Sequence, residues 1–437
     1  MLKETLYSEP RMPQACLLVA FLLISLPALS QEGKETIPDG TQGERLEVMD
    51  STSIPERWRD KRWRLFPGKF SSLKLGGGFL YEFAGYSQDE MGRRQTDSIG
   101  SPLTPEFDVR DLRVTLSGQL KRNSRISWKA GFMYDGPSRS WFVRETGVMI
   151  AVPELWGRFF IGRTKEGFSM NKVMVGYAGW TLERQMAIDV IPILADGVKW
   201  LGYLPRERIF WNIGGYGDWL SEGESFSTYT WQAAVRIGWL PLFTEPDKMV
   251  LHIGMNYRYG EPKNGNMRLR SRPEVNAAPR FIDTGDFFSD HSDHMGGEVY
   301  YRNGPWMLGS EIYVHRFKSM QTDNPVFAGG EVVVSYLFNG ASRPYYPSTA
   351  VFGFVPVSRP VFKGGPGVWE ALVRMSTLDL NGGTLKGGKF WRITPMVNWY
   401  MSKDVRLELA YGYGVLDRFN LKGATHFFQC RLQFTLL

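Results

Sequence analysis

Residues 108–135 have the sequence D-V-R-D-L-R-V-T-L-S-G-Q-L-K-R-N-S-R-I-S-W-K-A-G-F-M-Y-D, in which apolar and polar residues alternate. In the first half, Leu112 and Val114 fall on one face, while Arg113 and Thr115 fall on the other. Side chains of a β-strand point alternately to opposite sides. The stretch therefore predicts two strands, each with an apolar and a polar face, joined by a tight hairpin.

The same alternation returns to the end of the chain in short segments closed by Gly, Pro, Asn or Asp. About sixteen segments show it: 72–84, 108–121, 126–135, 142–152, 156–164, 196–204, 206–218, 231–239, 251–259, 295–302, 305–317, 327–338, 366–380, 391–399, 405–413 and 428–436. An even number near sixteen is typical of a transmembrane antiparallel β-barrel wide enough to hold water. A soluble β-sandwich is the alternative. Trp and Tyr repeatedly end the apolar faces, as in the aromatic belts of a lipid-exposed barrel, so the all-β membrane barrel is favoured.

The N-terminus carries an export signal. Arg11 precedes an apolar run at 16–29, and Ala28 and Ser30 are small residues placed for cleavage after Ser30. A retained anchor helix is the alternative, but the run is shorter than the ~20 residues of a span. We expect a cleaved signal peptide at 1–30, a periplasmic leader at 31–71 and the barrel at 72–437.

Charge and cysteine content exclude other classes. The net charge of +7 is spread along the chain instead of forming a basic patch, and export also argues against nucleic-acid binding. Of the two cysteines, Cys16 lies in the signal peptide, so Cys430 has no disulfide partner. No G-x-S-x-G or H-E-x-x-H motif is present, and we predict neither an enzyme nor a cofactor.

The polar strand faces carry more arginine and lysine than acidic residues, and they should line the lumen. A positive lumen between low-dielectric walls attracts anions, and arginine keeps its charge at any relevant pH. Many of these arginines should pair with neighbouring carboxylates and only stabilise the wall. The predicted pore-lining and anion-binding residues are Arg113, Arg125, Lys129, Arg158, Arg163, Lys165, Arg236, Arg258, Arg374, Arg392, Arg406 and Arg431.

Two long segments interrupt the strand pattern. Residues 164–206 are too long for a periplasmic turn. If this segment folds inward as a constriction loop, Arg163, Lys165, Lys172 and Arg184 could reach the wall arginines; solvated loop charge is the alternative. Residues 264–296 are expected to form an exterior loop, whose D-H-S-D-H sequence at 290–294 is better explained as hydrated side chains than as a metal site.

Several stretches resemble the phosphate-selective porins O and P. These are 108–120, W-G-R-F-F-I-G-R-T-K-E-G-F-S at 156–169, R-P-E at 272–274 with P-R-F-I-D-T-G-D at 279–286, S-Y-L-F-N-G-A-S-R-P-Y at 335–345 and W-E-A-L-V-R-M-S-T-L-D-L-N at 369–381. The resemblance implies a homotrimer of sixteen-stranded barrels in the outer membrane of a Gram-negative bacterium, with loops folded inward and basic residues guiding phosphate or similar small anions. A barrel that binds a ligand or partner through its exterior loops is the alternative function.

Overall fold

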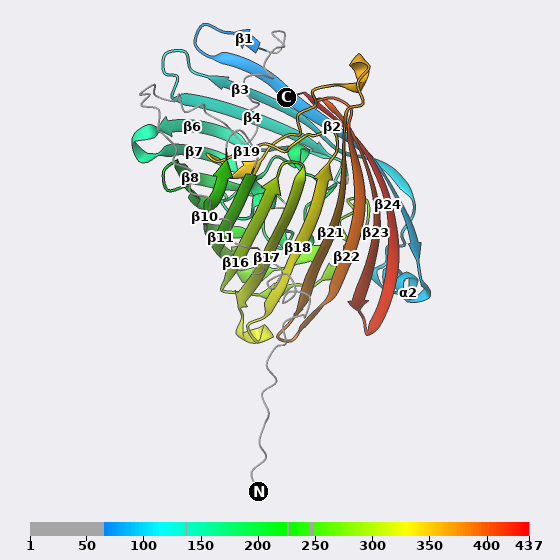
Figure 1. Cartoon of the computed structure of the whole chain (residues 1–437). Coiled ribbons are helices and arrows are strands. Elements are labelled where there is room, and N and C mark those ends of the chain that lie inside the picture. Colours follow the sequence, from blue (N-terminus) through cyan, green and yellow to red (C-terminus); the bar gives the residue numbers. More distant parts are fainter. Residues whose placement is uncertain (1–64, 137, 225–226, 245–248, 437) are drawn as a thin grey trace. The chain divides into compact units, whose positions relative to one another are not determined.

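The computed structural model describes residues 65–136, 138–224, 227–244 and 249–436, so the expected signal peptide and most of the leader lie outside it. Within these residues, sixteen wall strands form one closed antiparallel sheet (Figure 1). Closure comes from β2 (Ser72–Gln88), which pairs with its neighbour in sequence and also with the last strand of the chain. The predicted all-β barrel is confirmed.

The wall strands follow one another around the barrel in chain order. After β2 they are β3 (Glu106–Gln119), β4 (Ile126–Asp135), β5 (Ser140–Val143) with β6 (Thr146–Val152), β7 (Gly157–Thr164), β8 (Ala195–Leu204), β9 (Ile209–Gly217), β10 (Tyr229–Thr244), β11 (Met249–Pro262), β16 (His291–Asn303), β17 (Trp306–Lys318), β18 (Val326–Leu337), β21 (Val368–Gly382), β22 (Leu385–Tyr400), β23 (Val405–Arg418) and β24 (Leu421–Leu436). Both β5 and β6 pair with β4, and they form one wall strand with an interruption.

The remaining elements are short. The strands are β1 (Leu65–Pro67), which pairs with β2, and three two-residue pairs, β12 (Asn266–Met267) with β15 (Phe287–Phe288), β13 (Arg270–Ser271) with β14 (Ile282–Asp283), and β19 (Tyr345–Tyr346) with β20 (Val351–Phe352). The helices are α2 (Glu90–Ile99), α3 (Met170–Val173) and 3-10 turns at Pro153–Leu155, Gly176–Ala178, Met186–Ile188, Lys263–Gly265, Met320–Thr322 and Val361–Lys363. None of the helices in the described part is long and apolar enough to cross a membrane.

The outer face of the wall is apolar, as the alternation predicted. Val114, Phe132 and Ile161 are more than a third exposed, which suits contact with lipid acyl chains. Paired rings mark the ends of neighbouring strands: the rings of Trp306 and Tyr336 lie 4.7 Å apart, and the stacked rings of Trp369 and Trp399 lie 4.8 Å apart. Such a belt of aromatic rings is expected at a membrane interface.

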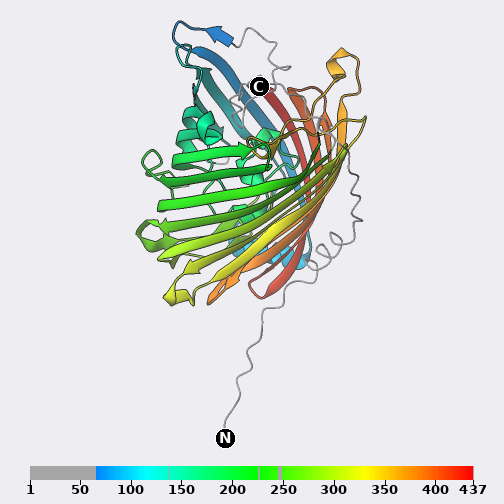
Figure 2. The same ribbon diagram turned by 60° about the vertical axis from the view of Figure 1, so that its left-hand side comes forward.

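Three connecting segments fill much of the lumen. The inner loop (165–194) leaves β7 and folds back between the strands (Figure 2). The mouth segment (263–290) lies between β11 and β16, and the inserted segment (338–367) lies between β18 and β21. The inserted segment leaves from the end of the barrel that carries β1 and the C-terminus, opposite α2 (Figure 1).

The constriction loop predicted within 164–206 is therefore confirmed, but the expectation of an exterior loop at 264–296 is wrong. Val275 and Phe281 of the mouth segment are almost completely buried, and residues from His291 onward belong to β16. The physical reason is the apolar cluster inside the barrel, in which Phe281 packs edge-on against Phe390 of the wall. Burying these side chains offsets the entropy of ordering a long segment.

Candidate functional site

Ten of the twelve predicted basic residues face the barrel interior, whereas Arg125 and Arg163 do not: Arg163 lies on the same face of β7 as the exposed Ile161. Arg125 lies in the turn between β3 and β4, where it pairs with Glu154 at 2.8 Å and both side chains remain more than half exposed. The alternation of side chains ends with the strand, so continuing it into the turn gave the wrong position. Arg163, at the end of β7, pairs with the buried Asp196 of β8 at 3.0 Å and joins two wall strands.

Six predicted arginines hold the three inner segments against the wall. Each donates to a carbonyl or carboxylate oxygen of an inner segment: Arg236, Arg258, Arg374, Arg392, Arg406 and Arg431. Arg236, for example, bonds Ala350 O of the inserted segment at 2.8 Å and also pairs with Glu298 at 2.6 Å. These contacts fix the segments against the wall, which is a structural role.

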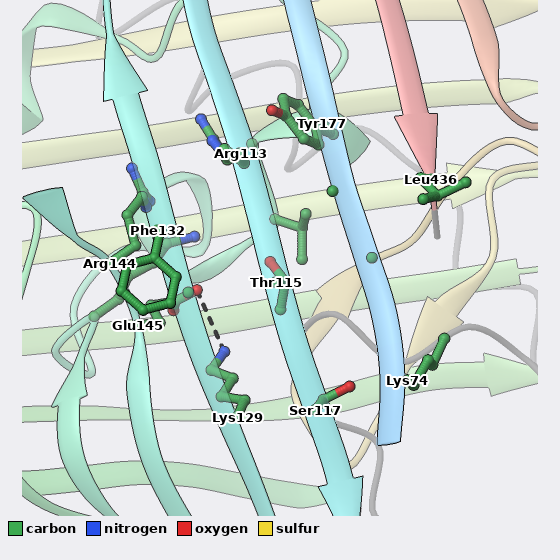
Figure 3. A pocket seen from close by; sticks show the side chains of 16 residues that line it. Lys74, Arg113, Thr115, Ser117, Lys129, Phe132, Arg144, Glu145, Tyr177 and Leu436 are labelled. Carbon is green, nitrogen blue, oxygen red and sulfur yellow. Dashed lines mark hydrogen bonds and ion pairs between the residues drawn. The ribbon is translucent and has the colours of Figure 1, made fainter. Parts of the chain in front are cut away.

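The other predicted residues, Arg113, Lys129, Arg158 and Lys165, line cavities along the β3 to β8 side of the lumen. We call the cavity of about 80 Å³ that is lined by Arg113, Lys129, Arg144, Glu145 and Lys165 the basic cavity (Figure 3). Lys129 and Lys165 also line a smaller cavity of about 30 Å³, which adds Arg158 and Lys199. Arg113 also lines one of about 40 Å³, which adds Arg184.

The interruption between β5 and β6 places two charges in the basic cavity. Val143 lies opposite Phe132, and Gly147 lies opposite Lys129, so residues 144–146 face only two residues of β4. Such a bulge re-aims side chains and breaks the alternation of faces. Arg144 and Glu145, although adjacent in sequence, consequently both line the cavity (Figure 3).

The cations of this region have few anionic partners. Within the part of the chain that the structure describes, neither Arg144 nor Lys165 has a carboxylate oxygen within 4.0 Å. Arg144 contacts Met133 Sδ at 3.4 Å, and the Lys165 amine donates to Met174 O at 2.6 Å. Arg113 pairs with Asp111 and lies over the ring of Tyr177, 4.3 Å from its centroid.

The surroundings of Lys165 and Arg184, the inner-loop cations, disfavour their charged forms and lower the pKa of each. Burial lowers the pKa of the Lys165 amine well below its usual value; Glu145 opposes this, but the charges of Arg184, Arg144 and Arg113 lower it further. Burial, followed by repulsion from Arg113, also lowers the pKa of Arg184 to about 10. The basic cavity and the neighbouring cavity lined by Arg184 thus gather positive charges that repel one another, and an anion placed among them would relieve that repulsion.

The family model for phosphate-selective porins O and P matches residues 75–436. The chain belongs to this family. Its barrel is accordingly that of an outer-membrane porin, and the basic cavity lies within the family's matched region.

Individual proteins resemble this porin O and P family member only in part of the sequence or only in fold. An uncharacterized protein of Caulobacter vibrioides is 30% identical over 179 residues, which are 40% of this chain and 35% of that relative, so the match spans about a third of the relative's length. OmpT of Vibrio cholerae has a similar fold, with a TM-score of 0.52 and 12% identity over 85% of this chain and 99% of its own. OmpT is also known in a trimer form, at a TM-score of 0.50 and 11% identity over 84% and 100%.

An anion-selective porin from Comamonas acidovorans is similar in fold as well. Its TM-score is 0.51 and its identity 11%, over 83% of this chain and all of that chain. At these identities the solved structures show the fold alone.

Sequence reasoning missed four basic residues that line the cavities of this porin family member: Lys74, Arg110, Arg144 and Lys199. Lys199 lies between the exposed Val198 and the outer-facing Trp200 of β8, so the alternation could have identified it. Arg144 could not be found in this way, because the bulge is visible only in the pairing of the strands.

The D-H-S-D-H sequence does not converge on one point. His294 is buried, with its Nδ1 2.8 Å from Nδ1 of His315, whereas His291 and Asp293 of the same strand are partly exposed. Among the residues with described positions, no three His, Cys, Asp or Glu side chains are grouped to hold a metal ion.

Proposed function

We propose that this protein is a passive diffusion pore that prefers anions, and that the basic cavity binds the permeating anion. The observation that carries the proposal is that Arg113, Arg144 and Lys165 line one cavity, in which neither Arg144 nor Lys165 has a carboxylate oxygen of the described residues within 4.0 Å. A permeating anion supplies the close counter-charge that Arg144 and Lys165 lack, because no carboxylate oxygen of the described residues lies within 4.0 Å of either cation. Transport then runs down a concentration gradient, without chemical turnover.

Phosphate or a similar small oxyanion is the proposed solute. A guanidinium offers a planar fork of N–H donors that matches the oxygens of phosphate, and an ammonium adds a further donor. Arg113, Arg144 and Lys165 approach the cavity from β3, from the β5–β6 bulge and from the inner loop, so the donors come from several directions. Membership of the phosphate-selective porin family supports the same solute class.

The proposed setting is a homotrimer in the outer membrane, reached by export with cleavage of a signal peptide after Ser30 and followed by a periplasmic leader at 31–71. The known trimer form of OmpT, whose fold is similar, supports the oligomer. Contact of the outer face with lipid follows from its exposed apolar side chains.

Single-channel recording in a planar bilayer tests the function. Under a potassium chloride gradient, the reversal potential should show chloride preference, and phosphate added to the bath should block the chloride current. Arg144→Met should raise the phosphate dissociation constant by about tenfold, the equivalent of one lost hydrogen bond to a charged group. Arg125→Met, which removes an exposed turn arginine, is the matched control and should leave the block unchanged.

Each other outcome has a definite meaning. Chloride preference without block would leave a general anion pore and remove phosphate as the solute. Cation preference would contradict the proposal, and absence of conductance would favour the alternative, a barrel that acts as a receptor through its exterior loops.

A further inference from the structure

Three buried carboxylates lie in a row on the opposite side of the lumen. Glu298 of β16 lies directly opposite Glu311 of β17, which in turn lies directly opposite Glu331 of β18. We call these three residues the carboxylate row; each is at most 3% exposed. Like charges placed opposite one another destabilise a sheet, and a negative row in an anion pore would also repel the solute.

The row is covered by the inner loop. Glu298 accepts from the Met170 amide at 2.6 Å, and Glu311 accepts from the Asn171 amide at 2.8 Å and from the Ser169 hydroxyl at 2.5 Å. Glu331 accepts from the Asn171 side-chain amide at 2.8 Å. Three consecutive loop residues, 169–171, thus donate at least one hydrogen bond to each of the three carboxylates. Hydrogen bonds to an ionised carboxylate are strong.

The loop residues that cover the row are joined by hydrogen bonds to the cations of the proposed anion site. Asn171 donates its amide to Glu311, and its own carbonyl oxygen accepts from Arg184 Nε at 2.8 Å. Three residues further on, Met174 O accepts from the Lys165 amine at 2.6 Å and from Arg184 Nη2 at 3.2 Å. The carboxylates and the two cations are therefore joined through one short stretch of loop backbone.

We propose that Glu298, Glu311 and Glu331 are positioning residues: they hold residues 169–171 and thereby set Lys165 at the basic cavity and Arg184 at the neighbouring cavity of about 40 Å³. This inference rests on the proposed function, since it says how the anion site is assembled. The row acts through the loop and does not touch the anion.

Positioning and direct electrostatics predict opposite changes in anion affinity when one of these carboxylates is removed. Removing a negative charge from the lumen should, by Coulomb attraction alone, strengthen anion binding. Loss of positioning should weaken it, because the loop cations move away from the cavity. In Glu311→Gln, the new amide would face the donors of Ser169 and Asn171 with its own N–H groups in one of its two orientations.

The experiment compares Glu311→Gln with Glu408→Gln by phosphate block of single channels. Glu408 is another fully buried lumen carboxylate, paired with Arg406 of its own strand at 3.1 Å. We expect Glu311→Gln to weaken block by about tenfold, as for the loss of one charge-assisted contact, and Glu408→Gln to leave it equal or tighter. Ser169→Ala, which keeps every wall charge, should weaken block in the same direction. Block that is unchanged or tighter in Glu311→Gln would overturn the inference while leaving the proposed function intact.

A second measurement tests the positioning without phosphate. In a Cys430→Ser background, a cysteine replaces Val175, a half-buried loop residue that lines the basic cavity. A charged thiol reagent should modify Val175→Cys faster when Glu311→Gln is also present, because the loop is released, and not faster with Glu408→Gln. Equal modification rates would overturn the inference, whether or not phosphate blocks the wild-type channel. Absence of phosphate block in the wild type would instead remove phosphate as the proposed solute.

Discussion

The two sides of the lumen carry different ionisable groups, and these groups have different partners. On the β16 to β18 side, the carboxylate row receives hydrogen bonds from residues 169–171 of the inner loop. On the β3 to β8 side, Arg144 and Lys165 have no carboxylate oxygen within 4.0 Å among the described residues. A buried carboxyl group that accepts hydrogen bonds from fixed donors stabilises structure, whereas a group of buried like charges is suited to a mobile counter-ion.

Removing Arg144 and Lys165 together should have the largest effect of the changes considered, because it deletes both cations that have no close carboxylate. In Arg144→Met with Lys165→Met, we expect the phosphate dissociation constant to rise by about a hundredfold, since each charged hydrogen-bond donor contributes roughly 1.5–3 kcal/mol. The free energy of unfolding should change little, because neither cation has an ion pair to lose. Single-channel block and denaturant unfolding in detergent measure the two quantities.

The conservative pair Arg144→Lys with Lys165→Arg keeps both charges and is the control for the double change. It should retain most of the block, with a loss that reflects only the altered donor geometry. A double methionine variant that still binds phosphate like the wild type would mean that the anion binds elsewhere in the lumen.

The opposite result is expected for Arg343, an arginine that forms an ion pair with a buried carboxylate. It bonds both oxygens of Glu370 at 3.0 Å and fixes the inserted segment through Ala178 O, also at 3.0 Å. Arg343→Met would leave a buried carboxylate without its counter-ion, so the free energy of unfolding should fall by about 3–5 kcal/mol. Phosphate block, measured on the channels that do insert, should remain close to that of the wild type.

A matched surface variant sharpens this prediction. Arg268 also binds both oxygens of its partner, Asp283, but its side chain is 43% exposed. Arg268→Met should cost only about 0–1 kcal/mol of unfolding free energy, as for other exposed ion pairs. If Arg343→Met cost no more than Arg268→Met, the inserted segment would not depend on its buried ion pair.

The wall was predictable from the sequence because one face meets lipid and the other meets polar groups. That contrast imposes a period of two, and it placed residues such as Arg236 and Arg392 inside the barrel correctly. Their anion-binding role stays a prediction, and their bonds to Ala350 O and Pro273 O favour a structural role instead. The alternation gives the direction of a side chain and not its partner.

The contents of the lumen were less predictable. The fold of the inserted segment depends on contacts between residues distant in sequence, such as the 2.7 Å hydrogen bond between Tyr345 and His252. No local periodicity encodes a contact of that kind. The length of 164–206 did indicate an inward loop. The bulge at Arg144, in contrast, could not be detected from the alternation of polar and apolar residues.

The smallest expected effect is a dependence of ion preference on pH, and it arises on the inner loop. Lys165 has a pKa well below its usual value, and burial lowers the pKa of Lys172 to about 8, although Glu166 opposes the shift. An amine is charged below its pKa and neutral above it, so raising the pH removes positive charge from the lumen. Between about pH 7 and pH 9.5 the chloride over potassium permeability ratio should therefore fall, by roughly a factor of two to three. Reversal potentials in a potassium chloride gradient measure this ratio without phosphate, which itself titrates in the range. Lys172→Met should show a lower ratio at pH 7 and a smaller change with pH, whereas Arg125→Met should follow the wild type. A ratio that rises with pH would mean that the amines of the inner loop do not set the preference of the pore.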